Sequence, residues 1–471
     1  MRAIAASTVL LVLLVHAGMS SARAQPVSLP APVSDPLAMD LDTDPLLAIE
    51  REVAEKTAFR ALLAQALEAN PSIREAEARN LEAVAGRNVA RSGQLPAGEL
   101  SVSSFRTLSR EFSNDPQNII ERSRARQRTD ATISLAQPLF DFGASADRIA
   151  AAQQRVAGSE ARFAATAEDI GLRAVAAWYE LFAMRTLVAL GEALDASQQT
   201  LGEAIDRRIE EGVAARSDRV RIDGAIAQSQ ARLAGYRRGQ AGAEARFGEL
   251  LGPPPPTLLR APVAIALADL QGDQLEQTAD SAPIVRAARA DADAAARDAE
   301  AVRADLFPTV SASIEAGRYG VFETDIDYDV RARLNVRLRL FGGGDARADQ
   351  AAARAMADGA RADRIRQEAL RDIRVAASDV RALELQLTAL RNSYVAAKIS
   401  RDVLVERFRV ARGSLFDVLS AEDAYFATAT AYVQAIVDLD IARYVLLART
   451  GQLLPALGFD RLSPSTWDSV R

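Results

Sequence analysis

Side chains that commonly carry catalysis or bind metals are almost absent from this chain. It has no cysteine, and its one histidine, His16, lies in an apolar stretch at the start. Once that stretch is removed, no Cys or His metal site and no His-dependent catalysis can remain. The 63 acidic residues outnumber the 57 basic ones, which argues against nucleic acid as a partner. We therefore expect no catalytic residue, no metal, no cofactor and no enzyme activity.

Charged side chains beside glycine recur at two points that read as turns between helices. The two sets are Gly212, Arg216 and Asp218, and Arg412, Gly413 and Asp417. Ser414 and Asp417 have the spacing of a helix capping box. In an oligomer, Asp417 could also form a ring of carboxylates that attracts cations. The arginines are either solvated or paired with nearby acids, or they clamp a closed state.

A third charged set alternates with apolar residues from Val330 to Leu340. Its members are Arg331, Arg333, Arg337 and Arg339. A period of two predicts a strand with one polar and one apolar face. The same alternation occurs at 309–317 and 131–135, and more weakly at 100–105, so each half offers one hairpin. Such strands fit either a soluble sheet or a membrane barrel with arginines in a watery lumen.

Very long helices must connect these charged turns to the strands. Residues 143–252 and 344–454 contain no proline and are rich in alanine, with apolar or aromatic residues at heptad spacing. In the second stretch, the heptad positions include Tyr394, Tyr425 and Tyr432, and Arg401 interrupts the pattern. This pattern predicts coiled coils. A helix from Ala144 to Glu211 would be about 100 Å long.

The two halves repeat each other at a spacing near 200 residues. Asn70-Pro71 precedes Leu95-Pro96 by the same 25 residues that separate Ala282-Pro283 from Phe307-Pro308. We therefore predict these segments: a signal peptide (1–24), a flexible leader (25–50), a first repeat (51–252; hairpin about 98–138, tip 212–218), a Pro-rich linker (253–275), a second repeat (276–454; hairpin 309–340, tip 412–417) and a tail (455–471).

The start of the chain has the pattern of a secretory signal. Arg2 precedes an apolar core, and Ala22-Arg23-Ala24 forms a small-x-small cleavage site. We expect no transmembrane helix in the mature chain. Four strands cannot close a barrel in lipid, because open sheet edges leave backbone groups unpaired. The chain is therefore expected to oligomerise.

Together, these motifs resemble the TolC family of outer-membrane efflux and secretion ducts. The residues that carry the resemblance are 65–71 (QALEANP), 137–143 (QPLFDFG), 211–218 (EGVAARSD) and 412–419 (RGSLFDVL). The resemblance implies a mainly α fold with a β-barrel portion: a homotrimer with a 12-stranded outer-membrane barrel and a 12-helix periplasmic tunnel. The strand-to-helix swivel would contain Pro138, Phe140, Gly143, Phe341 and Gly344.

The resemblance also implies how the two tips work. They would dock a periplasmic adaptor protein and close the tunnel like an iris, with Asp218 and Asp417 at the tips. A companion acid is usual three residues after Asp417; Ser420 stands there, and Glu422 and Asp423 are the candidates to replace it. Arg219 also departs from the aliphatic residue that usually follows the first aspartate.

The function predicted on this basis is a passive exit duct in the outer membrane of a Gram-negative bacterium, extending into the periplasm. An inner-membrane ABC transporter or antiporter would supply the energy. The segments 414–423 and 442–451 are most similar to type I protein-secretion members, and the lack of a lipid-anchor cysteine agrees with this. Small-molecule efflux is the alternative, and a periplasmic coiled-coil scaffold is a more distant one.

Overall fold

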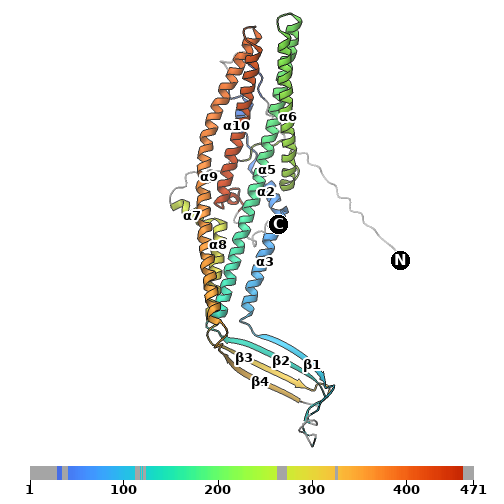
Figure 1. Cartoon of the computed structure of the whole chain (residues 1–471), viewed down its shortest axis with the longest axis vertical. Coiled ribbons are helices and arrows are strands. Elements are labelled where there is room, and N and C mark those ends of the chain that lie inside the picture. Colours follow the sequence, from blue (N-terminus) through green and yellow to red (C-terminus); the bar gives the residue numbers. More distant parts are fainter. Residues whose placement is uncertain are drawn as a thin grey trace, which may run out of the picture.

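The computed structural model describes residues 29–33, 41–111, 117, 119, 123–262, 273–323 and 327–459. The predicted signal peptide, parts of the predicted leader and linker, and residues 460–471 of the predicted tail lie outside the described residues. The described chain is a long rod, with a β-sheet at one end and two helical hairpins at the other (Figure 1).

The same order of elements occurs twice along the chain. The first half contains α2 (Lys56–Ala69), α3 (Pro71–Ser92), β1 (Ala97–Arg106), β2 (Gln127–Phe140), α5 (Ala144–Glu210) and α6 (Arg216–Leu251). The second half contains α7 (Asp273–Ser281), α8 (Pro283–Ala304), β3 (Thr309–Tyr319), β4 (Asp327–Arg337), α9 (Gly344–Arg409) and α10 (Leu415–Arg449). The short helices α1 (Pro45–Ala48) and α11 (Leu453–Ala456) lie before and after them.

Local sequence signals set the start of α3 and α8. The Asn70 side chain accepts a hydrogen bond from the Ser72 N–H at 2.9 Å, and Pro71 occupies the first turn of α3. Pro283 likewise occupies the first turn of α8. Proline is favoured there because its missing N–H has no partner to lose. The predicted helix boundary at Asn70-Pro71 is confirmed.

The predicted long helices are also confirmed. α5 has 67 residues and α9 has 66, so each extends about 100 Å. α5 packs against α3, α6, α8 and α10. Within the described residues, one 18-residue window of α5 is apolar enough to cross a membrane, but 72% of it is buried inside the chain.

The four strands form one antiparallel sheet in the order β1-β2-β3-β4. Residues directly across from each other include Leu100 and Ile133 on β1 and β2, and Ile314 and Ala332 on β3 and β4. The antiparallel pairing of β2 with β3 joins the two predicted hairpins into one sheet. Within the described chain β1 and β4 each have one neighbour only, so both outer edges of the sheet are unpaired.

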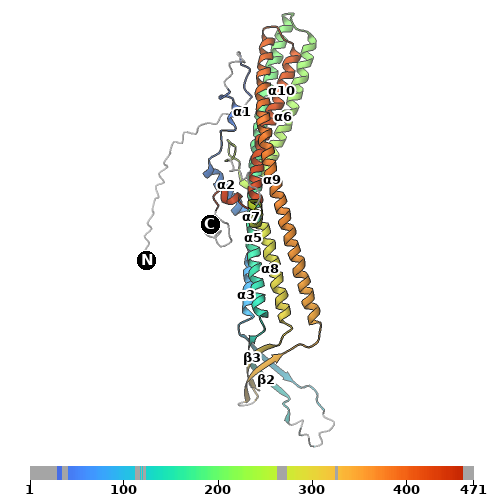
Figure 2. The same ribbon diagram turned by 90° about the vertical axis from the view of Figure 1, so that its left-hand side faces the viewer.

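The main hydrophobic core lies around the middle of the rod, where the short helices pack against its side (Figure 2). Phe59 of α2 packs edge-on against Trp178 of α5, with ring centroids 5.0 Å apart. Tyr394 of α9 stacks on Tyr425 and Tyr432 of α10, with centroids 5.6 Å apart in each pair. These tyrosines occupy the predicted heptad positions, which confirms the coiled-coil pattern of the second half.

Candidate functional site

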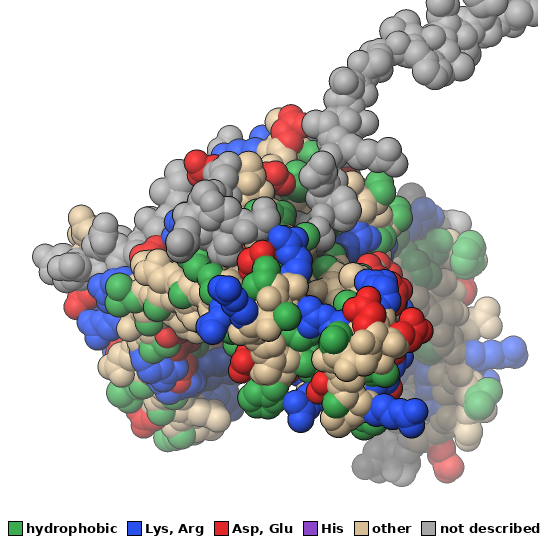
Figure 3. All heavy atoms as spheres, turned by 90° about the horizontal axis from the view of Figure 1, so that it is seen from above, with side chains coloured by type: hydrophobic (Ala, Val, Ile, Leu, Met, Phe, Trp, Pro, Cys, Tyr) green, Lys and Arg blue, Asp and Glu red, His purple; other side chains and the backbone are tan. Residues whose placement is uncertain are grey.

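The two helical hairpins, α5–α6 and α9–α10, end together at the end of the rod that is farthest from the sheet (Figure 1). Seen from this end, basic, acidic and hydrophobic side chains are interspersed, and no single charge type dominates (Figure 3). Apolar residues of both hairpins share one small core here, which includes Ile205, Ile222, Phe408 and Leu415. The tips therefore pack against each other within one chain.

Both tips turn through the same hydrogen-bond pattern. At the first tip, the N–H groups of Gly212 and Val213 donate to the carbonyls of Ile209 and Arg208, at 3.0 and 2.8 Å. This is a Schellman motif, which needs a left-handed residue after the helix. Gly212, with φ of 75°, provides it.

At the second tip, alanine takes the place of that glycine. The N–H groups of Ala411 and Arg412 donate to the carbonyls of Phe408 and Arg407, at 3.0 and 2.8 Å. Ala411 has φ of 57°, a conformation that costs a residue with a Cβ some strain. The predicted turn glycine, Gly413, is not left-handed. A Cβ on it would lie 3.2 Å from the Phe408 backbone nitrogen, so close packing explains the glycine.

The predicted capping box at Asp417 is present. Ser414 Oγ accepts from the Asp417 N–H at 3.2 Å, and Asp417 Oδ2 accepts from the Ser414 backbone N–H at 3.4 Å and from the Ser414 hydroxyl at 2.8 Å. At the first tip, Asp218 Oδ2 accepts from the Ala215 N–H at 3.3 Å. Asp417 is nevertheless exposed. Capping is therefore compatible with a second role, and the ring of carboxylates stays a prediction.

The two candidates for a second acidic ring, Glu422 and Asp423, both contact other helices of the same chain. Glu422 is only 4% exposed, and its Oε1 accepts from the Ser197 hydroxyl of α5 at 2.7 Å. Burial raises the pKa of this carboxyl, although the Ser197 bond partly opposes the shift. Asp423 forms an ion pair with Arg232 of α6 at 2.9 Å. Both side chains thus make contacts between helices of one chain, and their part in a second acidic ring stays a prediction.

The arginines near the tips have different environments. Arg216 and Arg412 are exposed, and neither forms an ion pair with another described residue. Arg219, which departs from the family pattern, forms ion pairs with Asp206 at 3.0 Å and Asp223 at 3.2 Å. Its charge is therefore neutralised within the first hairpin.

A further arginine joins the two tips, and sequence reasoning missed it. The Arg208 guanidinium donates to the Phe408 carbonyl at 2.9 Å and lies 4.2 Å from the centre of the Phe408 ring. Arg208 is on α5 and Phe408 on α9, so this contact, which we name the tip latch, holds the hairpins together. Nothing local in the sequence marks it, because its members are 200 residues apart.

The sheet has one polar and one apolar face. The apolar face carries Leu100, Val102, Ile133, Leu135, Ile314, Val330, Leu334 and Val336, all exposed in the single chain. Eight exposed large apolar side chains on one face of a sheet mark a surface that another apolar phase must cover. The opposite face carries the predicted arginines.

Three of the four predicted arginines lie on β4. Arg333 forms an ion pair with Glu315 at 3.4 Å, and Arg331 pairs with Asp329. Arg337 is across from Thr309 and forms no ion pair with another described residue. The prediction for Arg339 is wrong in one respect: β4 ends at Arg337, two residues earlier. Its neighbour β3 begins at Thr309, directly after Pro308, which has no N–H to continue the ladder.

The junction between sheet and helices contains the predicted swivel residues. β2 runs through Pro138, and its register against β3 shifts between Pro138 and Phe140. The Phe140 and Phe142 rings have centroids 4.7 Å apart, and Phe142 stacks on Phe307 at 5.0 Å. Phe341, by contrast, is 90% exposed. The matching motifs of the two halves therefore make different contacts.

Left-handed residues allow the chain to turn from strand into helix at both junctions. They are Phe142 and Gly143 before α5, and Gly342 and Gly343 before α9. The predicted swivel glycine Gly344 is instead the first residue of α9. A Cβ on Gly344 would lie 2.7 Å from Leu306 Cδ2, so the glycine permits close packing on the end of α8.

Buried ion pairs fasten the described N-terminal segments to the long helices. Asp44 caps α1 and pairs with Lys398 of α9, and both side chains are almost fully buried. Arg401, which interrupts the heptad pattern, donates to the Pro30 carbonyl at 3.0 Å and stacks 4.3 Å from the Tyr425 ring. The Asp44–Lys398 and Pro30–Arg401 contacts span 354 and 371 residues of sequence, so no local pattern indicated them.

In the part of the chain that the structure describes, no group of three or more His, Cys, Asp or Glu side chains could hold a metal ion. The candidate site thus consists of a two-faced sheet, a pair of long helical hairpins and charged tips.

Comparisons with known proteins agree with this geometry. A sequence model of the family described as "Outer membrane efflux protein" matches residues 62–253 and 275–452. The chain is 26% identical over 326 residues to outer membrane efflux protein BepC of Brucella suis biovar 1 (strain 1330), covering 68% of this chain and 72% of BepC. It is 28% identical over 350 residues to protein CyaE of Bordetella pertussis, covering 68% and 70%.

Solved structures share the fold. The outer-membrane channel OprN superposes with a TM-score of 0.74 at 21% identity, covering 86% of this chain and 92% of OprN. The predicted architecture, mainly helical with a barrel-forming sheet, and the predicted location, the outer membrane with an extension into the periplasm, are confirmed. The chain belongs to the outer membrane efflux protein family, the TolC-like channels.

Proposed function

We propose that this chain is the passive exit duct of a tripartite export system, most specifically of type I protein secretion, and that it works as a homotrimer. The observation that carries the proposal is the two-faced sheet with unpaired edges, continuous with helices about 100 Å long. A sheet of this kind is stable in lipid only when its edges are closed by further copies.

Three copies supply what a single chain lacks. Four strands per copy give 12, enough to close a barrel with its apolar face toward lipid and Arg331, Arg333 and Arg337 toward the lumen. The helices α3, α5, α8 and α9 together line one groove of about 490 Å³. In a trimer, the side of the helices that carries this groove would line the tunnel.

The tips would form the periplasmic gate. Asp417 is exposed at the end of the tunnel, and three copies would bring three carboxylates together. The tip latch between Arg208 and Phe408 would hold the closed arrangement. A periplasmic adaptor would dock at these tips, and an inner-membrane ABC transporter would supply the energy for transport through the passive duct.

Two substrate classes compete within this function. The segments 414–423 and 442–451 resemble type I secretion members, which favours export of a protein. Small-molecule efflux, driven by a transporter or an antiporter, is the second candidate, because the matching family and the relative BepC are both described as efflux proteins.

The experiment that separates them compares the culture supernatant of a deletion strain with that of its parent by mass spectrometry. Type I secretion predicts that a large protein disappears from the supernatant and returns on complementation. An unchanged set of secreted proteins, with higher sensitivity to dyes and detergents, would instead identify the exit of a small-molecule pump.

A further inference from the structure

A ladder of ion pairs joins α5 to α8 within the chain. Its arginines lie on α5 at intervals of seven residues, and its aspartates lie on α8 at the same interval: Arg148 with Asp305, Arg155 with Asp298, and Arg162 with Asp291. The Arg162 guanidinium reaches both Asp291 oxygens, at 2.7 and 3.0 Å. Seven-residue spacing keeps each row on one face of its helix.

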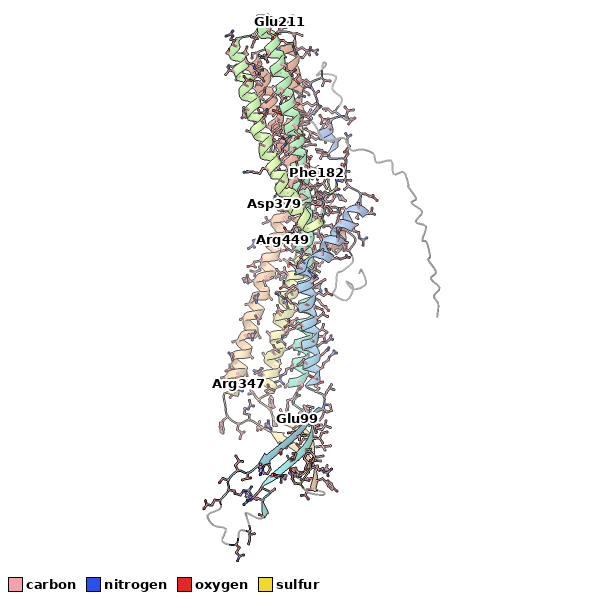
Figure 4. All side chains as sticks on the ribbon, turned by 90° about the vertical axis from the view of Figure 1, so that its right-hand side faces the viewer. Glu99, Phe182, Glu211, Arg347, Asp379 and Arg449 are labelled. Atoms are coloured by element: carbon pink, nitrogen blue, oxygen red, sulfur yellow. The ribbon has the colours of Figure 1, made fainter. Side chains whose placement is uncertain are left out.

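The same row of arginines recurs on α9, where it has no acidic partners. The groove that all four helices line contains Arg162 of α5 and Arg361 of α9 at matching positions, a shift of 199 residues. The shift places Arg347, Arg354 and Arg361 in a second row, which is exposed. Arg347, at the sheet end of α9 (Figure 4), donates to the Gly342 carbonyl at 3.1 Å. Arg354 and Arg361 form no ion pair within the described chain.

The helix that would face this second row is α3, the counterpart of α8. Both have 22 residues and begin with proline, so α3 and α8 correspond by a shift of 212. The counterparts of the three aspartates are Arg79, Gly86 and Gly93, none of which is acidic.

One acidic residue on α3 nevertheless lies close to the expected contact line. Glu82 is exposed, and its counterpart on α8, Ala294, is buried. Val89 is 70% exposed, although its counterpart Ala301 is 1% exposed. The face of α8 that is covered within the chain is therefore uncovered on α3. α3 and α9 therefore each present a contact face that has no partner helix in the described chain.

We propose that α3 of one copy binds the arginine row of α9 in a second copy, and that Glu82 of the first lies between Arg354 and Arg361 of the second. This inference rests on the proposed trimer and specifies its subunit boundary. Glu82 is three residues after Arg79 and four before Gly86, so it is one turn from both counterpart positions. The contact line between copies thus holds one acid and four arginines, Arg79 included, whereas the line within the chain pairs each of three arginines with an aspartate.

Disulfide cross-linking tests the proposed register, because the chain has no cysteine of its own. A Cβ built on Gly158 of α5 lies 3.4 Å from the Ala290 Cβ of α8. The counterparts of these two residues are Ala357 on α9 and Ala78 on α3. Cβ atoms about 3.5–4.5 Å apart permit a disulfide. The A78C/A357C variant should therefore form covalent dimers and trimers on oxidation.

Two control variants make the result specific. G158C/A290C should cross-link within one chain and leave its mass unchanged. A78C/D363C should not cross-link between copies, because position 363 is about 240° around α9 and about 9 Å along it from position 357. A wild-type protein that is trimeric by native mass spectrometry but whose A78C/A357C variant stays monomeric after oxidation would overturn the proposed boundary and leave the duct intact. A monomeric wild-type protein would overturn the duct as well.

Charge exchange tests the Glu82 contact itself. E82R and R354E should each lower the temperature at which the trimer dissociates, and the combined E82R/R354E variant should regain most of the loss. The matched control is E77R, one and a half turns away on α3, combined with R354E, which should show no recovery. A double charge exchange no more stable than the worse single variant would overturn the contact.

Discussion

Breaking the tip latch should open the duct. In the Arg208→Ala variant, the Phe408 carbonyl loses its 2.9 Å hydrogen bond and the ring loses the guanidinium 4.2 Å away. A hydrogen bond from a charged donor contributes about 1.5–3 kcal/mol, and an exposed cation–π contact about 0.5–1 kcal/mol. Because Arg208 is only partly buried, we assign about 2 kcal/mol to the whole latch. Its loss would change the equilibrium constant between the closed and open tip arrangements by roughly 30-fold in each subunit.

The assay is the ionic current through purified protein in planar lipid bilayers. Arg208→Ala should raise the fraction of time spent in the conducting state by at least tenfold. Arg207→Ala is the matched control, since Arg207 is exposed in the same helical turn and makes no ion pair within the described chain. Equal currents in both variants would refute the claim that the latch holds the closed arrangement.

Other changes have equally definite outcomes. Asp417→Ala should weaken the block of ionic current by multivalent cations, because it removes three carboxylates from the proposed gate; an unchanged block would contradict the acidic ring. Burial raises the pKa of Glu168 from 4.5 to about 8, so the unfolded chain ionises first and stability falls by about 1.4 kcal/mol per pH unit between these values. Thermal unfolding at pH 5 and pH 8 should show this loss in the wild type and not in Glu168→Gln. Lys398→Met leaves Asp44 charged and buried, which should cost about 3–5 kcal/mol in chemical denaturation; a loss below 1 kcal/mol would contradict the buried pair. Arg337→Glu should shift the reversal potential in a salt gradient toward cations, and an unmoved potential would place Arg337 outside the lumen.

Patterns with a short period made most of the architecture predictable. The alternation from Val330 onward fixed the two faces of β4, and the heptad positions of Tyr394 and Tyr425 fixed the packing of α9 on α10. Both signals are local, because a strand repeats every two residues and a coiled coil every seven. The arginine rows on α5 and α9 also have a seven-residue period, so the ladder could have been found in the sequence.

Contacts between distant segments were not predictable in this way. Asp44 and Lys398 are 354 residues apart, and nothing in either neighbourhood indicates the other. The Ser197 hydroxyl that donates to the buried Glu422 carboxyl is 225 residues away in the sequence. Ala411 rather than Gly413 carries the left-handed turn, because the cap of α9 falls two residues earlier than the glycine suggests. The roles proposed for Asp218, Asp417 and the arginines Arg216 and Arg412 stay predictions.

The decisive experiment on the duct is the current through the purified wild-type protein, with trivalent cations added to either side of the bilayer. A gated trimer with its barrel in lipid predicts discrete current steps. It also predicts a reversible block from the side that the tips face and none from the other. An inserted, trimeric protein that passes no current, or a block that is equal from both sides, would contradict the account.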